Sequence, residues 1–119
     1  RRIEQAQQLS QSFGKFDLRL STFDFQPSTF DLIINTTPLG MPPNIEDSPL
    51  PENMVLSPKT VIYDLIYNPR ETKLVKDVRA QGLSATTGLG MLIEQAALAF
   101  EKWTDHNPPR ETLYQAVQP

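Results

Sequence analysis

The sequence predicts an α/β fold in which helices flank a mostly parallel sheet. Short runs of apolar and β-branched residues alternate along the chain with segments of helical periodicity, the order of elements that builds parallel sheets. No internal repeat or low-complexity segment interrupts this alternation. Because 119 residues are enough for one compact domain, we expect residues 1–119 to form a single unit.

The N-terminal part of the chain is expected to hold one helix and two strands. Residues 1–12 predict the helix, because apolar residues recur at helical spacing and a glycine follows. Residues 16–22 alternate apolar and polar side chains, as in a strand with one buried face. Residues 30–35 are a short apolar run, typical of a strand buried on both faces. The apolar face of the helix consists of Ile3, Ala6, Leu9 and Phe13.

The middle of the chain predicts a long loop, a strand and a helix. Five prolines fall within fourteen residues of the segment 36–58, which is therefore expected to be an ordered, proline-stiffened loop. Residues 60–65 are β-branched and apolar and predict a strand. Residues 71–81 carry an apolar stripe at helical spacing, and Gly82 is placed to end that helix. The stripe consists of Leu74, Val75 and Val78.

The C-terminal part predicts a brief strand at 83–85, a strongly apolar helix at 91–103 and a short final helix at 110–117. The apolar helix is expected to bury two neighbouring faces. These faces consist of Leu92, Ala96, Ala99 and Trp103, and of Met91, Gln95, Leu98 and Lys102.

Composition and charge exclude several classes of function. With 11 basic and 14 acidic residues the net charge is −3, which disfavours binding to nucleic acid or to anionic lipid. The absence of cysteine excludes a disulfide, a thiolate nucleophile and a zinc–thiolate site, and the single His106 excludes a multi-histidine metal site. No apolar run approaches the roughly 20 residues that span a bilayer. We therefore expect a cytoplasmic protein without a metal and, since the chain begins with Arg1, part of a longer one.

Three segments follow predicted strands and carry the residues best suited to hold a ligand. They are residues 35–41, 64–69 and 86–92. In an open parallel sheet, ligands bind outside the carboxyl ends of the strands, where loops and helix N-termini present backbone N–H groups. The three segments therefore predict one binding site along that edge of the sheet.

Each of these segments also has a purely structural explanation. A Thr-Thr-Pro sequence after a strand commonly forms a turn whose hydroxyl bonds to its own backbone. Gly88 and Gly90 can simply permit positive φ before a helix. Tyr67 can be a half-buried core residue. From the residues alone, both explanations stay open.

Gln95 is the polar residue that fits its surroundings least well. It lies within the apolar helix, where burying its amide without a partner costs about 1–3 kcal/mol. We expect a polar ligand or a neighbouring backbone group to satisfy that amide. By contrast, His106 lies among polar residues and prolines and is expected to be a solvated loop residue.

Taken together, the three segments resemble the C-terminal part of shikimate dehydrogenases. The matching motifs are Asn-Thr-Thr-Pro-Leu-Gly-Met from residue 35, Tyr-Asp-Leu-Ile-Tyr-Asn-Pro from residue 63, and Gly-Leu-Gly-Met-Leu-Ile-Glu-Gln-Ala-Ala from residue 88. Thr72, Phe100 and Trp103 complete the pattern, and the order and spacing of the motifs match as well. The resemblance implies the second half of a Rossmann-like domain, NADP as cofactor, and the reversible reduction of 3-dehydroshikimate to shikimate in aromatic amino-acid precursor synthesis.

The resemblance also implies roles for individual residues. It places Tyr67 and Gln95 at the substrate. At the NADP cofactor it places Arg1, Asn35, Thr36, Thr37, Leu39, Leu65, Gly88 and Met91.

Two parts of the family's machinery have no counterpart in the 119 residues. One is the glycine-rich turn that lets a pyrophosphate approach a helix N-terminus. The other is a lysine and aspartate pair that handles the proton at the reacting carbonyl. In the family both lie upstream, so the resemblance implies a missing N-terminal domain as partner and no catalytic residue in this chain. Losing the groups that position both reactants forfeits about 7–11 kcal/mol, so the chain alone is expected to be inactive.

Two alternatives remain open. One is a quinate or shikimate dehydrogenase that prefers NAD. The other is a non-catalytic binding or assembly module that retained the fold. Members of the family are monomers or homodimers, and the sequence leaves both states open.

Overall fold

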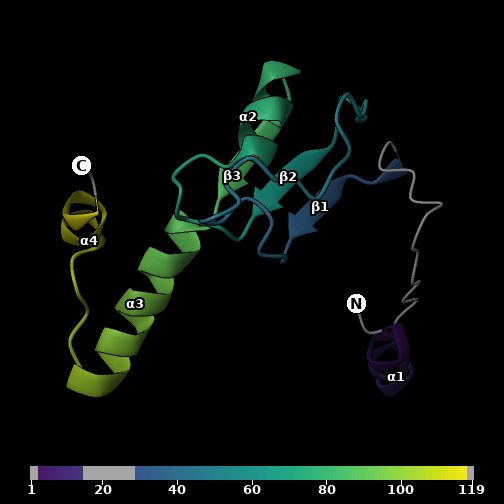
Figure 1. The fold of residues 1–119 in the computed structure, drawn as a ribbon. Coiled ribbons are helices and arrows are strands. Elements are labelled where there is room, and N and C mark those ends of the chain that lie inside the picture. Colours follow the sequence, from purple (N-terminus) through teal and green to yellow (C-terminus); the bar gives the residue numbers. More distant parts are fainter. Residues whose placement is uncertain (1–2, 15–28, 118–119) are drawn as a thin grey trace.

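The computed structural model describes residues 3–14 and 29–117 (Figure 1). The described part confirms the predicted α/β class, with three strands and four helices in these ranges. The elements are α1 (Ile3–Ser12), β1 (Leu32–Asn35), β2 (Val61–Asp64), α2 (Lys73–Ala80), β3 (Ser84–Thr87), α3 (Leu89–Thr104) and α4 (Arg110–Ala116).

The three strands form one parallel sheet in the order β1-β2-β3. Asn35 of β1 pairs with Asp64 of β2, which in turn pairs with Thr87 of β3. All three strands therefore end at the same edge of the sheet, and their arrows point the same way in Figure 1. Parallel neighbours need a crossover connection, and α2 lies in the one between β2 and β3.

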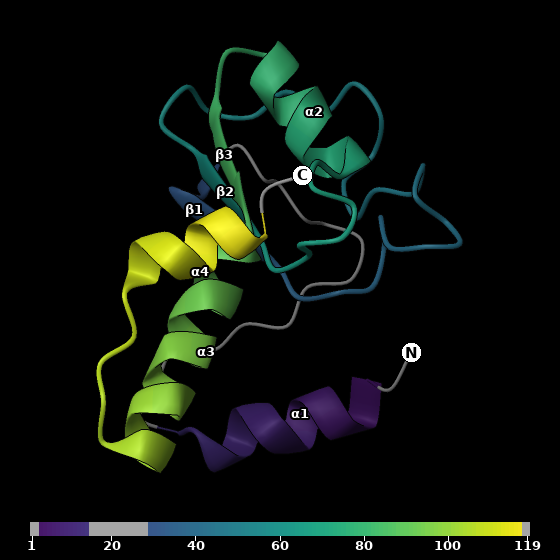
Figure 2. The same ribbon diagram turned by 90° about the vertical axis from the view of Figure 1, so that its left-hand side faces the viewer.

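The core lies between the sheet and α2, which covers one of its faces (Figure 2). Alternate strand residues point to that face, and Ile62 of β2 is fully buried there. The predicted apolar stripe of α2 is buried as expected, and Leu56 from the preceding loop closes the cluster. Burying each such aliphatic side chain contributes about 1.5–3 kcal/mol to folding.

Both ends of α2 follow from its sequence. The Thr72 side chain caps the N-terminus by accepting a hydrogen bond from the Val75 N–H at 3.3 Å. At the other end Gly82 adopts a φ of +77°, and its N–H donates to the Arg79 carbonyl at 2.9 Å. The helix is therefore slightly shorter than the predicted 71–81.

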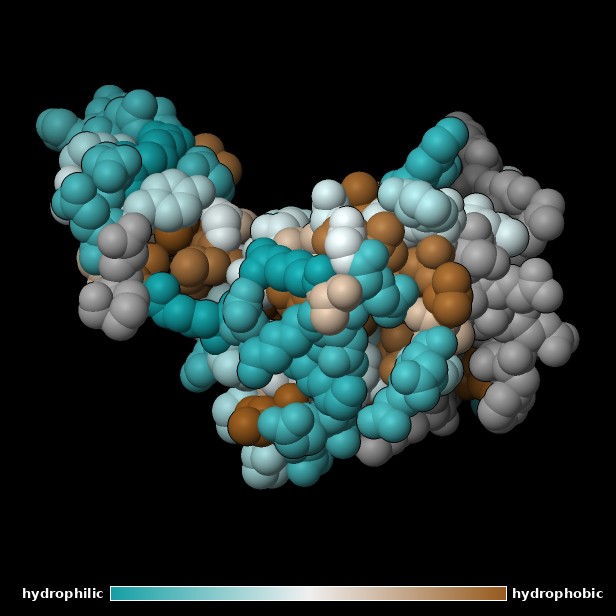
Figure 3. Space-filling view, turned by 90° about the horizontal axis from the view of Figure 1, so that it is seen from above, coloured by the Kyte–Doolittle hydropathy of each residue, from teal (hydrophilic) through white to brown (hydrophobic). Residues whose placement is uncertain are grey.

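The opposite face of the sheet is exposed, which corrects the prediction for residues 30–35. Leu32 and Ile34 of β1 are 54% and 50% exposed, and Val61 of β2 is 41% exposed. The apolar run of β1 is thus covered on one face only. Among the described helices α2 packs on the sheet, and it lies on the face opposite to Leu32, Ile34 and Val61. Figure 3, seen from above the view of Figure 1, shows that hydrophobic residues reach the surface at several places.

Helix α3 packs against α4, and the ion pair between Glu94 and Arg110, at 3.4 Å, joins the two (Figure 2). Only Ile93 and Ala97 of α3 are buried, so the prediction of two buried faces is wrong. Trp103 is 83% exposed. The side of α3 with Ile93 and Ala97 is buried against its described neighbours, while the residues of the two predicted faces are partly or largely exposed.

The predictions for the N-terminal helix and the long loop agree with the structure. Helix α1 ends before Gly14 as expected, although Ile3 and Leu9 on its apolar face are exposed and α1 lies apart from the sheet in both views (Figures 1 and 2). The segment 36–58 is an ordered loop without helix or strand. The predicted strand at 16–22 lies outside the described residues. In the described ranges, each helix is too short or too polar to cross a membrane.

Candidate functional site

The loops that follow β1 and β2 enclose a hollow of about 540 Å³ at the carboxyl ends of the strands. One wall comes from the segment 36–42 and the other from the segment 65–68. Two of the three segments singled out in the sequence therefore meet where ligands bind in open parallel sheets. The lining residues are Thr36, Thr37, Pro38, Met41, Pro42, Leu65, Ile66, Tyr67 and Asn68.

A buried polar cluster lies beneath this hollow. Asp64, at the end of β2, is fully buried, and Asn35 beside it is 4% exposed. The Asn35 side-chain amide donates to one Asp64 carboxylate oxygen at 3.0 Å. The Thr72 hydroxyl donates to the other oxygen at 2.6 Å. The cluster thus ties the ends of β1 and β2 to the start of α2.

The Asn35 side chain also shapes the first wall of the hollow. Its carbonyl oxygen accepts from the Thr37 N–H at 2.9 Å and from the Thr37 hydroxyl at 2.7 Å. The Thr37 oxygen in turn accepts from the Leu39 N–H at 3.3 Å. Thr37 therefore closes a local turn, as the structural explanation held, and Asn35 supports this loop from below.

The third segment approaches the second wall through its backbone. The Gly88 N–H donates to the Ile66 carbonyl at 3.0 Å. A Cβ on Gly88 would lie 2.1 Å from the Leu65 carbonyl oxygen, so no other residue fits here without a shift. Gly88 has a φ of −71°, and Gly90 is likewise not among the described residues with positive φ. The positive-φ explanation is therefore wrong, and close packing against Leu65 explains Gly88 instead.

Gln95 is exposed on α3, so the expectation that its amide is buried is wrong for the described residues. Successive residues of an α-helix are about 100° apart around its axis, so Gln95, two residues from both Ile93 and Ala97, faces away from these buried residues. Its side chain is therefore available to a ligand or to another part of the protein.

Some of the other predicted site residues line the hollow and others lie outside it. Tyr67 is 48% exposed and lines the hollow, as do Thr36 and Leu65. Leu39 is 37% exposed but lies outside the lining, and Met91 is half-buried in the first turn of α3. Arg1 lies outside the described residues.

Sequence reasoning assigned no role to Asp64, Thr72 or Met41. A signal for Asp64 was present, because a carboxylate within the apolar run 60–65 requires partners wherever that strand is buried. The partners themselves come from segments distant in the sequence.

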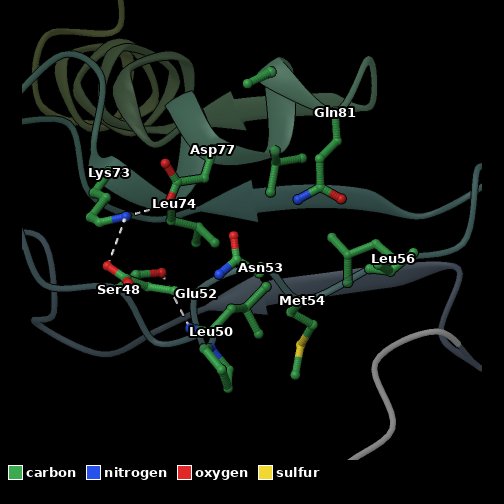
Figure 4. Close-up of a pocket in the computed structure, with 14 residues that line it drawn as sticks. Ser48, Leu50, Glu52, Asn53, Met54, Leu56, Lys73, Leu74, Asp77 and Gln81 are labelled. Atoms are coloured by element: carbon green, nitrogen blue, oxygen red, sulfur yellow. Dashed lines mark hydrogen bonds and ion pairs between the residues drawn. The ribbon is translucent and has the colours of Figure 1, made fainter.

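A second hollow, of about 550 Å³, lies between α2 and the loop 48–56 (Figure 4). Lys73 crosses its rim, with its ammonium nitrogen 2.6 Å from Asp77 and 3.8 Å from Glu52. The hydrogen bond with Asp77 raises the pKa of Lys73 above its ordinary value of 10.5. This hollow lies along the length of α2 and contains none of the predicted site residues. Within the described ranges, no group of three or more acidic or histidine side chains could hold a metal ion.

The parallel sheet, its crossover helix and the hollow at the strand ends define an open α/β domain of the Rossmann-like class. Comparison with known proteins identifies the relatives of this domain. The family described as "Shikimate 5'-dehydrogenase C-terminal domain" matches residues 88–118. The shikimate dehydrogenase (NADP(+)) of Salinibacter ruber is 37% identical over 126 residues, which cover 99% of this chain and 44% of the relative.

Solved structures of shikimate dehydrogenases have a similar fold. A shikimate dehydrogenase in complex with NADP+ superimposes with a TM-score of 0.81 at 37% identity, over 94% of this chain and 40% of that one. The shikimate 5-dehydrogenase of Listeria monocytogenes, in complex with shikimate and NAD, gives a TM-score of 0.68 at 32% identity, over 73% of this chain and 30% of that one. The resemblance predicted from the sequence is confirmed, and the chain is related to the C-terminal part of shikimate dehydrogenases. It spans less than half the length of each of these relatives.

Proposed function

We propose that this chain is the C-terminal, NADP-binding part of an enzyme that reversibly reduces 3-dehydroshikimate to shikimate. The observation that carries the proposal is the strand-end hollow, whose two walls are the Thr-Thr-Pro and Leu-Ile-Tyr segments. The proposal is supported by the relatives, since the Salinibacter ruber protein is named shikimate dehydrogenase (NADP(+)) and a structure with a similar fold is a shikimate dehydrogenase in complex with NADP+. When bound, the cofactor supplies the hydride.

The residues present fit a nicotinamide nucleotide. Leu65, Met41 and Ile66 give the hollow apolar surface for a flat ring, and Thr36 adds a hydroxyl at its edge. Gly88 lets the start of α3 pack against the Leu65 backbone, which brings the N-terminus of that helix beside the second wall. Leu65 and Gly88 would hold the nicotinamide side, and the 35–39 segment would hold the ribose side.

Substrate contacts are proposed for Tyr67 and Gln95. Tyr67 borders the hollow and is half exposed, so its hydroxyl can reach a polyhydroxylated ring placed at the mouth. Gln95 lies exposed on α3, where its amide can both donate to and accept from hydroxyl groups. These residues orient the substrate, while proton transfer is assigned to a lysine and aspartate pair in the upstream part of the longer protein.

The proposal is tested by shikimate-dependent reduction of NADP, measured on this chain and on the longer protein that contains it. We expect activity in the longer protein only, because the chain lacks the glycine-rich turn and the proton-transfer pair. Inactivity of both would contradict the proposal and favour a non-catalytic module with the same fold. Activity of the chain alone would show that the upstream groups are dispensable.

A preference for NAD is the second candidate, favoured by the related Listeria structure that contains NAD. Comparing turnover with NADP and with NAD decides between the two cofactors. Comparing shikimate with quinate as the oxidised substrate decides the substrate in the same assay. Gel filtration of the longer protein distinguishes the monomer from the homodimer.

A further inference from the structure

Asp64 is a buried carboxylate that has no cationic partner among the residues that the structure describes. Its side chain is fully buried, and none of the ion pairs among the described residues includes it. Removing a carboxylate from water costs several kcal/mol unless hydrogen bonds replace the lost hydration. Asp64 obtains them from three donors: the Asn35 amide at 3.0 Å, the Ile66 N–H at 3.1 Å and the Thr72 hydroxyl at 2.6 Å.

The three donors belong to three different segments. Asn35 ends β1 and holds Thr37, so it controls the first wall of the strand-end hollow. Ile66 belongs to the second wall. Thr72 is the N-cap of α2. A single carboxylate therefore links both walls of the hollow to the helix that follows, beside the backbone hydrogen bond from the Leu65 N–H to the Asn35 carbonyl at 3.1 Å.

We propose that Asp64 is a positioning residue, which sets the distance between the two walls so that the nucleotide and the substrate meet in a reactive geometry. This inference rests on the proposed function. Packed apolar side chains in place of the whole cluster could give the same stability, because replacing all partners of a buried polar or ionic network by apolar groups of similar volume is often neutral or stabilising. A fully satisfied polar network instead specifies one arrangement of its members. Here the network joins residues that belong to, or hold, the two walls of the hollow, so it specifies how the walls are arranged.

The test compares three variants of the longer protein. Asp64→Ala removes all three acceptor contacts. Asp64→Asn keeps the shape: its carbonyl oxygen can accept from Asn35 and Ile66, and its amide can donate to the Thr72 oxygen. Thr60→Val is the matched control. Thr60 is 1% exposed, and its hydroxyl donates to the Phe30 carbonyl at 2.7 Å, at the opposite end of the two strands that Asp64 joins.

We expect Asp64→Ala to lower kcat/KM for NADP by roughly 10- to 100-fold, since a displacement of about 1 Å has effects of that size. Asp64→Asn is expected to keep most of the wild-type kcat/KM for NADP. Thr60→Val is expected to lower the melting temperature but to leave kcat and both KM values unchanged. The inference is overturned if Asp64→Ala keeps wild-type kinetics, or if Thr60→Val loses as much activity.

Hydrogen–deuterium exchange on the same variants separates this inference from the proposed function. If the wild-type protein has no dehydrogenase activity, the proposed function fails, and exchange still reports on the walls. Asp64→Ala is expected to accelerate exchange in both segments 36–42 and 65–68, and Thr60→Val to leave both unchanged. Equal exchange of these segments in the two variants would show that Asp64 does not position them.

Discussion

The contact between Gly88 and Leu65 shows how a single missing side chain shapes the site. A Cβ at residue 88 would meet backbone atoms, which cannot rotate away as the end of a flexible side chain could. We therefore expect Gly88→Ala to push the start of α3 away from the second wall. Overpacking of this kind costs about 1–3 kcal/mol of stability, and chemical denaturation of the longer protein measures it.

Gly90→Ala is the matched control for this prediction. A Cβ at residue 90 would lie 3.7 Å from the Tyr114 hydroxyl oxygen, an ordinary contact. Because Gly90 lies in the first turn of a helix, alanine there is expected to be neutral or to stabilise by up to about 1 kcal/mol. Equal losses in the two variants would refute the role of close packing at Gly88.

Gln95→Ala tests the proposed substrate contact. Since Gln95 is exposed in the described structure, we expect this change to raise the KM for shikimate far more than the KM for NADP. Steady-state kinetics on the longer protein provides both values. Glu101→Ala, an exposed change on the same helix, should alter neither. Equal increases in both KM values for Gln95→Ala would contradict the assignment.

At the level of residues, the sequence predicts which segments form the site better than what each side chain does there. Local motifs place Thr36, Leu65 and Tyr67 in the hollow. They do not reveal that Asp64 bonds to Asn35, because that contact joins residues 29 positions apart and depends on the register of β1 with β2. Nor do they reveal that Gln95 is exposed, because that depends on which neighbours cover α3.

At the level of elements, Thr72 has two functions, as the cap of α2 and as a donor to Asp64. We expect Thr72→Ala to lower the free energy of unfolding by about 1–3 kcal/mol, because it removes the cap and leaves a buried carboxylate oxygen without its donor. Thr72→Ser keeps the hydroxyl and should retain most of that stability. Urea denaturation measures both, and equal losses in the two variants would rule out the hydroxyl as the cause.

Helix α2 and strand β3 differ in how far the local sequence determines them. Helix α2 has its apolar stripe, its cap and its terminal glycine within one short segment, so the local sequence predicts its place to within about a residue or two at each end. Strand β3 was expected at 83–85 and lies at Ser84–Thr87. Its position depends on pairing with β2, from Val61 opposite Ser84 to Asp64 opposite Thr87, and no local pattern encodes that register.

At the level of the whole molecule, the described structure leaves apolar surface that an isolated domain normally covers. The exposed sheet face carries Leu32, Ile34 and Val61, and Trp103 is exposed on α3. Parallel sheets are usually covered on both faces, because crossover helices pack on each side. The sequence pattern of β1 predicted such double burial, and the described residues supply one of the two covers.

Ile34→Lys tests whether this face matters to the isolated chain. We expect the wild-type chain to bind a hydrophobic dye and to self-associate as its concentration rises, and Ile34→Lys to reduce both effects by placing a charge on the face. Ile45→Lys is the matched control, because Ile45 is 44% exposed against 50% for Ile34 but lies in the long loop. In the longer protein, we expect the upstream part to cover this face, since parallel sheets are usually covered on both sides. Ile34→Lys is then expected to lower the melting temperature, and Ile45→Lys to have little effect. If the two variants behave alike in both proteins, the sheet face is not the surface against which the upstream part folds.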